Sequence, residues 1–248
     1  MLQRAGSQIS RVPIAPKLTL VGMGKERARI DHAFAKGESV LILGPAGSGK
    51  TRLLQDAAAA QSGVLYFAWE ATLHGLLSGM ARALIAERHA EFLKRAKPGH
   101  DTETWIGAQT SLHLKGLVWN AIEAAPVPMI FDGVEGAGFR TYRFLQRIYH
   151  MRGLVLVAAS RDSTSMGALG RLFWNPTKTV NLLPLNDRDA AKLFEAAADS
   201  FQLRHLDLAD FREKVLLNAS GNPGPIKKGW SRCAPAQFCL DGRRRFGR

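Results

Sequence analysis

The stretch from Gly44 to Thr51 constrains the fold of this chain more than any other feature. It reads GPAGSGKT and fits the pattern G-x-x-x-x-G-K-[ST] of a phosphate-binding loop. Glycines let such a loop turn its backbone N–H groups into one concavity, which suits an anion. Lys50 supplies a positive charge for the phosphates, and Thr51 supplies a hydroxyl ligand for Mg²⁺. We therefore expect ATP and Mg²⁺ as ligands, held by Gly44, Pro45, Ala46, Gly47, Ser48, Gly49, Lys50, Thr51 and Arg52.

The flanks of this loop have the expected character. Residues 39–43 form a short apolar run, which is typical of a strand buried on both faces of a parallel sheet. Residues 52–60 are rich in strong helix formers. The order strand, glycine loop, helix is the context that the motif needs, and it predicts an α/β fold.

Further apolar runs and helical patterns follow along the chain. The other expected strands are 64–68, 128–132, 153–159 and 179–183. The expected helices are 25–35, 73–94, 104–125, 138–149, 188–201 and 207–218. In the helix over 104–125 we expect the large apolar side chains to lie in the core; these are Trp105, Leu112, Val118, Trp119 and Ile122.

Polar residues follow the strands at the edge where α/β proteins bind ligands. Asp132 ends an apolar run, as expected of a second Mg²⁺ ligand opposite Thr51. Many P-loop ATPases place a water-activating glutamate directly after this aspartate, but Gly133 stands there. Glu135 and Glu70 are the two alternatives for that role. Ser160 and Arg161 follow the strand over 153–159, where they could sense the γ-phosphate.

The charge of the chain is concentrated at its ends. The net charge is +13, yet residues 30–226 are nearly balanced, with 21 basic and 19 acidic side chains. Inside that part, Arg140, Arg143 and Arg147 share one helix face, and residues 136–161 contain no acid. This face and the basic termini either bind DNA phosphates or are simply solvated. The chain has no apolar run of membrane-spanning length, and its two cysteines form no metal or disulfide framework, so we expect a cytoplasmic protein.

The order of these pieces resembles the AAA+ ATPases and the related STAND ATPases, in particular the compact branch with origin-recognition initiators and transposition-helper ATPases. The turn Gly22-Met23-Gly24-Lys25-Glu26 looks like the turn that precedes their first helix. Ser160-Arg161 resembles their sensor-1 segment, and Leu183-Pro184-Leu185 resembles the entry to their helical lid. Gly221-Asn222-Pro223 resembles the lid motif whose proline, here Pro223, lies near the adenine.

The resemblance implies a five-stranded parallel sheet of order 5-1-4-3-2, flanked by helices and followed by a short helical lid. The expected divisions are a flexible basic lead-in over 1–17, a P-loop core over 18–184, a lid over 185–228 and a basic irregular tail over 229–248. The resemblance also implies a homo-oligomer.

Three functions remain open from the sequence. The first is a Mg²⁺-dependent ATPase that acts as a nucleotide-driven switch, with DNA as a candidate partner. The second is a non-hydrolysing, nucleotide-gated DNA-binding or adaptor protein, because Gly133 replaces the usual glutamate. The third is a small-molecule phosphotransferase, for which the sequence offers no acceptor or general-base motif.

Overall fold

A computed structural model describes residues 20–151, 155–173, 175–200 and 208–227. The expected lead-in over 1–17 and tail over 229–248 lie outside these residues, as do positions 153, 154, 201 and 207 of the expected elements. The chain forms two compact units, and the first comprises Met23–Leu183. The described parts of the second unit are residues 20–22, 184–200 and 208–227.

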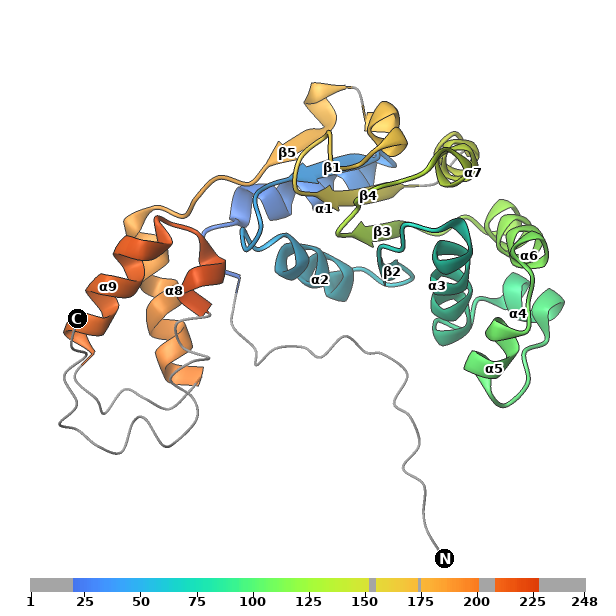
Figure 1. Cartoon of the computed structure of the whole chain (residues 1–248), viewed down its shortest axis with the longest axis horizontal. Helices are drawn as coiled ribbons and strands as arrows, with labels where there is room; N and C mark the ends of the chain where they lie inside the picture. The colour runs from blue at the N-terminus through green and yellow to red at the C-terminus, as the bar shows by residue number, and fades with distance from the viewer. Residues whose placement is uncertain (1–19, 152–154, 174, 201–207, 228–248) are drawn as a thin grey trace, which may run out of the picture. The chain divides into compact units, whose positions relative to one another are not determined.

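The first unit is built on a parallel sheet of five strands (Figure 1). The strands are β1 (Val40–Leu43), β2 (Leu65–Ala68), β3 (Met129–Asp132), β4 (Leu156–Ser160) and β5 (Thr179–Asn181). Their order is β2-β3-β4-β1-β5, which confirms the order expected from the sequence. β1 lies between β4 and the edge strand β5, so the loop that follows it leaves an interior strand of the sheet.

Helices cover the sheet and enclose one main core. They are α1 (Gly24–Lys36), α2 (Lys50–Ala60), α3 (Leu73–Ala86), α4 (Ala90–Ala96), α5 (Thr102–Gly107), α6 (Ser111–Ala124) and α7 (Phe139–Tyr149), with 3₁₀ turns η1 (Ala168–Phe173) and η2 (Pro176–Lys178). α3 packs against β2 and α6, and α2 packs against β2 and β3 (Figure 1). The core unites fully buried side chains of different elements, such as Leu77, Val118, Phe131 and Phe144.

The two long helices expected over 73–94 and 104–125 are each broken, and the prediction was wrong there. Arg88 adopts a left-handed backbone conformation with φ 53°, which ends α3. His89 then caps α4 by accepting a hydrogen bond from the N–H of Phe92. Between α5 and α6, the hydroxyl of Thr110 accepts from the N–H of His113 and starts a new helix. Capping side chains favour the start of a new helix. The apolar periodicity continues across both caps, so the sequence pattern predicts one continuous helix in each place.

The break at Thr110 also explains one error in the expected core. Leu112 was expected to be buried, but 80% of it is exposed. Leu112 lies in the first turn of α6, which is a separate helix from α5. The apolar residues of α5 therefore do not determine which way the Leu112 side chain points. Val118 and Ile122 are fully buried, while Trp105 and Trp119 are partly buried against the core.

The second unit is helical in its described part. It contains α8 (Asp187–Ser200) and α9 (Ala209–Ala219), which pack together with the rings of Phe194 and Phe211 5.9 Å apart. Gly221 has φ 76°, and its carbonyl accepts a hydrogen bond of 2.8 Å from the N–H of Leu185. A Cβ at Gly221 would lie 2.4 Å from the Leu185 carbonyl oxygen, so only glycine fits this contact. Residues 223–227 are again helical.

Candidate nucleotide and magnesium site

The loop from Gly44 to Gly49 has a backbone that requires its glycines. Gly47 and Gly49 have φ of 81° and 94°, in the region that side chains disfavour. Gly44 is buried, and a Cβ there would lie 2.7 Å from the Ser48 hydroxyl oxygen and 3.1 Å from Leu182 Cβ. The loop leads directly into α2, so the N-terminal N–H groups of that helix face the same place. We call this concave loop the cradle, and its geometry suits an anion.

Lys50 stands at the first position of α2, and its side chain folds back over the loop. Its ammonium donates hydrogen bonds to the carbonyls of Gly44 at 2.6 Å and Pro45 at 2.8 Å. An ammonium has three donors, so one remains for an incoming oxygen. Burial lowers the pKa of Lys50 below its ordinary value, while the negative charges of Asp132 and Glu135 oppose that shift.

The ends of three neighbouring strands meet at this cradle. Leu43 at the end of β1 pairs with Ser160 at the end of β4, and the N–H of Gly44 donates to the Ser160 carbonyl at 3.3 Å. Asp132 ends β3. The charges of Asp132, Glu135 and Arg161 all act on the pKa of Lys50, so these side chains share one electrostatic environment. Of the residues expected to form a site, Asp132, Glu135 and Arg161 are therefore close enough to Lys50 to influence its charge.

Asp132 is half-buried, and one oxygen of its carboxylate is held by a neighbouring strand. The hydroxyl of Tyr66 donates a hydrogen bond of 2.8 Å to Asp132 Oδ2. Burial is the largest cause that raises the pKa of Tyr66, followed by the charge of Asp132, so the phenol remains a proton donor. Neither sequence pattern nor motif spacing singled out Tyr66. The only available signal was a polar side chain inside an otherwise apolar strand.

The donors at this place fit Mg²⁺ bound together with a nucleotide. Mg²⁺ is usually held by one or two protein oxygens plus phosphate oxygens and water, rather than by a full protein cage. Thr51 offers a hydroxyl at the exposed start of α2, and Asp132 offers a carboxylate. No cluster of three or more His, Cys, Asp or Glu that could hold a metal alone occurs among the described residues. Such a cluster is not what a nucleotide-borne Mg²⁺ requires.

The segment after β3 is fixed in place by the rest of the first unit. The N–H of Val134 donates to the Ala159 carbonyl at 2.7 Å, and the N–H of Gly136 donates to the Ser165 carbonyl at 2.8 Å. Between them, the indole of Trp69 donates to the backbone carbonyl of Glu135 at 2.7 Å. The Glu135 side chain itself is exposed, so it is available to the solvent beside the cradle.

Gly133 occupies the position where many P-loop ATPases have a glutamate. The backbone conformation at this position explains why a glycine stands there. Gly133 has φ 75°, and Gly136 has φ 62°. A residue with a side chain at Gly133 would be strained in this left-handed conformation. The backbone therefore turns immediately after Asp132, and Glu135 is the first acidic side chain beyond the turn.

Glu70, the alternative to Glu135, lies close to residues of α3. Its charge contributes to raising the pKa of Arg82 on α3, behind the larger effect of Glu103. Its Cβ also lies close to Gly75, where an added Cβ would come within 3.0 Å. Glu135, unlike Glu70, is among the charges that shift the pKa of Lys50. The electrostatic environment therefore favours Glu135 over Glu70.

Ser160 and Arg161 lie at the same edge of the sheet but differ in their exposure to solvent. Ser160 is fully buried, and its hydroxyl lies 2.7 Å from the Val134 carbonyl and 3.0 Å from that of Asp162. This hydroxyl therefore ties two loops together. Arg161 is 58% exposed, and its guanidinium contacts Ser165 Oγ at 3.2 Å and Asp162 at 3.4 Å. Arg161 is the more accessible of the two to a ligand.

The remaining expected residues lie elsewhere. Arg52 is half-buried in the first turn of α2. Arg140, Arg143 and Arg147 are exposed on α7, at helical spacing on one face. Pro223 belongs to the second unit, where it begins the helical residues 223–227. The proposed contact of Pro223 with adenine remains a prediction.

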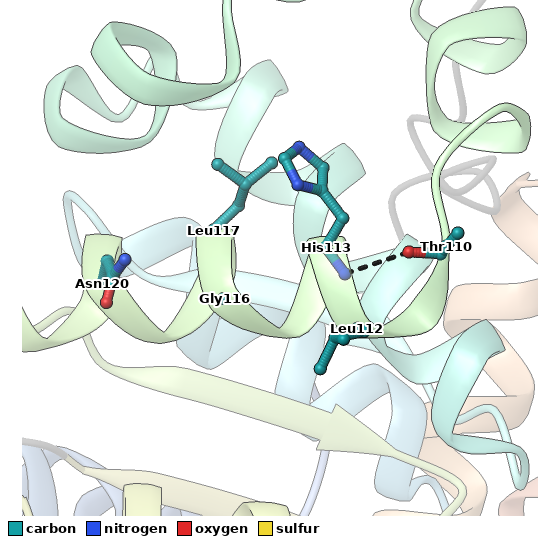
Figure 2. Close-up of a pocket in the computed structure, with 6 residues that line it drawn as sticks. All are labelled: Thr110, Leu112, His113, Gly116, Leu117 and Asn120. Atoms are coloured by element: carbon teal, nitrogen blue, oxygen red, sulfur yellow. Dashed lines mark hydrogen bonds between the residues drawn. The ribbon is translucent and has the colours of Figure 1, made fainter.

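The structure also contains a hollow that includes none of the residues expected to bind nucleotide, metal or DNA. Figure 2 shows it along α6, lined by Thr110, Leu112, His113, Gly116, Leu117 and Asn120. Its volume is about 380 Å³, and all its lining residues come from this helix and its cap. It is an open depression with few polar groups, and we assign no function to it.

Comparison with known proteins identifies the fold. No family model and no curated protein sequence matches this chain. Among solved structures, the Walker-type ATPase of Pyrococcus abyssi matches with a TM-score of 0.62 at 14% identity, covering 91% of this chain and 72% of that protein. AMPPCP-bound DnaA from Aquifex aeolicus matches with a TM-score of 0.54 at 17% identity, covering 90% and 64%.

A third match is a point mutant of Thermotoga maritima RuvB, with a TM-score of 0.53 at 15% identity, covering 86% of this chain and 62% of RuvB. The chain shares the fold of these proteins, a P-loop fold with a five-stranded parallel sheet flanked by helices. It spans less than two thirds of the length of DnaA and RuvB. No helix in the described part of the chain is both long and apolar enough to cross a membrane.

Proposed function

We propose that this protein binds Mg²⁺·ATP at the cradle from Gly44 to Thr51 and hydrolyses it. The observation that carries the proposal is the geometry of the strand ends: Asp132 ends β3, Arg161 follows β4, and both strands end at the same edge of the sheet as β1, which leads into the glycine loop and Lys50. A glycine loop alone binds an anion. A loop joined by a metal-binding carboxylate, a second acid and an arginine has the groups that phosphoryl transfer to water requires.

Each side chain has a role in this proposal. The loop N–H groups and Lys50 hold the phosphates, and Thr51 and Asp132 hold Mg²⁺, which neutralises developing charge when bound. Glu135 orients and deprotonates the attacking water. Arg161 contacts the γ-phosphate, and Ser160 fixes the loops that carry Glu135 and Arg161. The second unit acts as a lid that responds to the nucleotide, with Pro223 near the adenine.

Nucleotide binding tests the first half of this proposal. Isothermal calorimetry should show ATP binding to the full chain in Mg²⁺, and Lys50→Ala should weaken it at least tenfold because a charged phosphate contact is lost. Lys36→Ala is the matched control, since Lys36 is an exposed lysine at the end of α1. Equal affinities in the wild type and Lys50→Ala would refute the assignment.

A second candidate function, nucleic-acid binding, rests on the exposed face of α7. Arg140, Arg143 and Arg147 make no ion pair among the described residues, and no acid lies in residues 136–151 or 155–161. Phe139 is 54% exposed on the same helix, with the Arg143 guanidinium 4.9 Å from its ring centre. Arginines beside an exposed aromatic ring suit phosphates and stacked bases. A DnaA replication initiator, a protein of the same fold, has been solved with AMPPCP and single-stranded DNA.

Salt dependence tests this second candidate. The slope of the logarithm of the DNA-binding constant against the logarithm of the salt concentration should become shallower when Arg140, Arg143 and Arg147 are together replaced by Ala. The slope should change by about 3, or about one for each phosphate contact that is lost. Arg95→Ala is the control, because Arg95 is already paired with Glu91 on α4. An unchanged salt slope in the triple variant would exclude α7 as the DNA surface. DNA binding that needs ATP in a protein with no turnover would instead favour the non-hydrolysing switch.

A further inference from the structure

The sheet register places Tyr66 and Asp132 on the same face. In the parallel pair β2 and β3, Tyr66 lies beside Ile130, and Asp132 follows two residues later. Side chains two apart on a strand share a face. The alternate residues, Phe67 and Phe131, point to the opposite face, where their rings lie 4.6 Å apart in the main core.

The face with Tyr66 and Asp132 is the one covered by α2. This helix packs on β2 and β3 and begins at Lys50. Its residue Gln55 lies near enough to the Tyr66 side chain to oppose the rise in the pKa of Tyr66. Thr51 and Gln55 are four residues apart, so they lie on one face of α2. The Tyr66 side chain thus lies beside α2 and binds the carboxylate at the end of β3.

We propose that Gln55 and Tyr66 are positioning residues for the magnesium site. The hydrogen bond from Tyr66 occupies Asp132 Oδ2 and fixes the carboxylate plane, and Asp132 Oδ1 would then be the oxygen that binds Mg²⁺. Gln55 orients the Tyr66 hydroxyl. Because Gln55 is one turn beyond Thr51 on α2, Tyr66 links the helix that carries Thr51 to the carboxylate of Asp132.

This inference rests on the proposed function, since it concerns the binding of Mg²⁺ with ATP. A positioning role for Tyr66 predicts one result that a role in packing alone does not. Removing the Tyr66 hydroxyl should leave nucleotide affinity without Mg²⁺ unchanged and alter only the response to Mg²⁺. Partners of metal ligands typically contribute 10- to 100-fold to metal affinity.

The test is a Mg²⁺ titration of the binding of a fluorescent, non-hydrolysable ATP analogue to the full chain. In Tyr66→Phe the Mg²⁺ concentration at half-effect should rise about tenfold, the lower end of that range. Gln55→Ala should cause a smaller rise, and the double variant should match Tyr66→Phe alone because Gln55 acts through Tyr66. Tyr149→Phe is the matched control, because burial also raises the pKa of Tyr149, on α7.

The outcomes separate this inference from the proposed function. Absence of nucleotide binding in the wild type, or an unchanged Mg²⁺ response in Asp132→Asn, would overturn the proposed site itself. A changed response in Asp132→Asn with an unchanged midpoint in Tyr66→Phe would overturn the positioning role alone. Equal loss of affinity with and without Mg²⁺ in Tyr66→Phe would assign Tyr66 to packing and would also overturn that role.

Discussion

At the scale of single residues, the site depends on backbone conformations that the sequence shows only in part. The loop glycines were recognised because a motif names them. Gly133 was noticed as a missing glutamate, whereas its structural role is a turn with φ 75°. Tyr66 and Trp69 were not predicted to serve the site. Their hydrogen bonds to Asp132 and Glu135 depend on which strands are neighbours, which no local pattern contains.

The conformation of Gly133 leads to a stability prediction. Gly133→Ala should lower the free energy of unfolding by about 1–2 kcal/mol, because an L-residue is strained at that φ while the added methyl meets nothing within 4 Å. Gly79→Ala is the matched control within α3, where the added methyl is also unobstructed. It should raise stability by about 0.5–1 kcal/mol. Urea unfolding measures both, and equal effects would contradict this account of Gly133.

The two glutamates give a prediction about catalysis. Glu135→Gln should lower the turnover of ATP by about 100-fold or more while leaving ATP affinity nearly unchanged, because a general base is lost and the phosphate contacts remain. Glu70→Gln removes the same charge at the end of β2 and should leave turnover within about threefold of the wild type. The reverse pattern in steady-state kinetics would assign the role to Glu70.

At the scale of elements, the loop after β4 supports the segment that carries Glu135. Asp162 Oδ1 accepts hydrogen bonds from the Thr164 hydroxyl at 2.6 Å and the Ser165 N–H at 2.7 Å. These bonds, with Thr164 the largest cause, hold the pKa of Asp162 below its usual range. The Ser165 carbonyl in turn accepts from Gly136. A short polar turn therefore fixes one end of the Glu135 segment.

The lowered pKa of Asp162 predicts a pH dependence of stability. A carboxylate whose pKa is lower in the folded state stabilises the fold above its unfolded pKa of about 3.9 and loses this effect as pH falls through the folded pKa. Asp162→Ala should therefore lower the thermal midpoint at pH 7, and its difference from the wild type should shrink below about pH 4. Glu38→Ala, at an exposed carboxylate, is the control. A difference that stays constant with pH would contradict the role of the ionised side chain.

The break between α3 and α4 gives a prediction about an element boundary. Arg88 is held at φ 53°, a conformation that costs a non-glycine residue about 1–2 kcal/mol. Arg88→Gly should therefore raise the free energy of unfolding by up to about 1 kcal/mol. Glu87→Gly, one residue earlier at φ −82°, should lower stability instead. Destabilisation by both substitutions in denaturant unfolding would argue against a left-handed break.

At the scale of the whole molecule, the sequence predicted the sheet better than the helices. The strands were found because each is a short apolar run between turns, and their order followed from the family that the motifs resemble. The helix breaks at Arg88 and Thr110 were missed because the apolar pattern continues on both sides. The exposed Leu112 is the direct consequence. The acids at the strand ends were predicted because parallel strands end at one edge, whereas the side chains that hold them come from neighbours distant in sequence.

We propose that the cradle of Lys50 and the acids around it form one catalytic site for ATP. The most direct test of this proposal is the steady-state rate of Mg²⁺-dependent phosphate release by the full chain, measured beside Lys50→Ala and with and without DNA. We expect measurable turnover in the wild type that needs Mg²⁺ and falls to background in Lys50→Ala. ATP binding without any turnover, in the presence or absence of DNA, would contradict hydrolysis and would favour a nucleotide-gated binding protein.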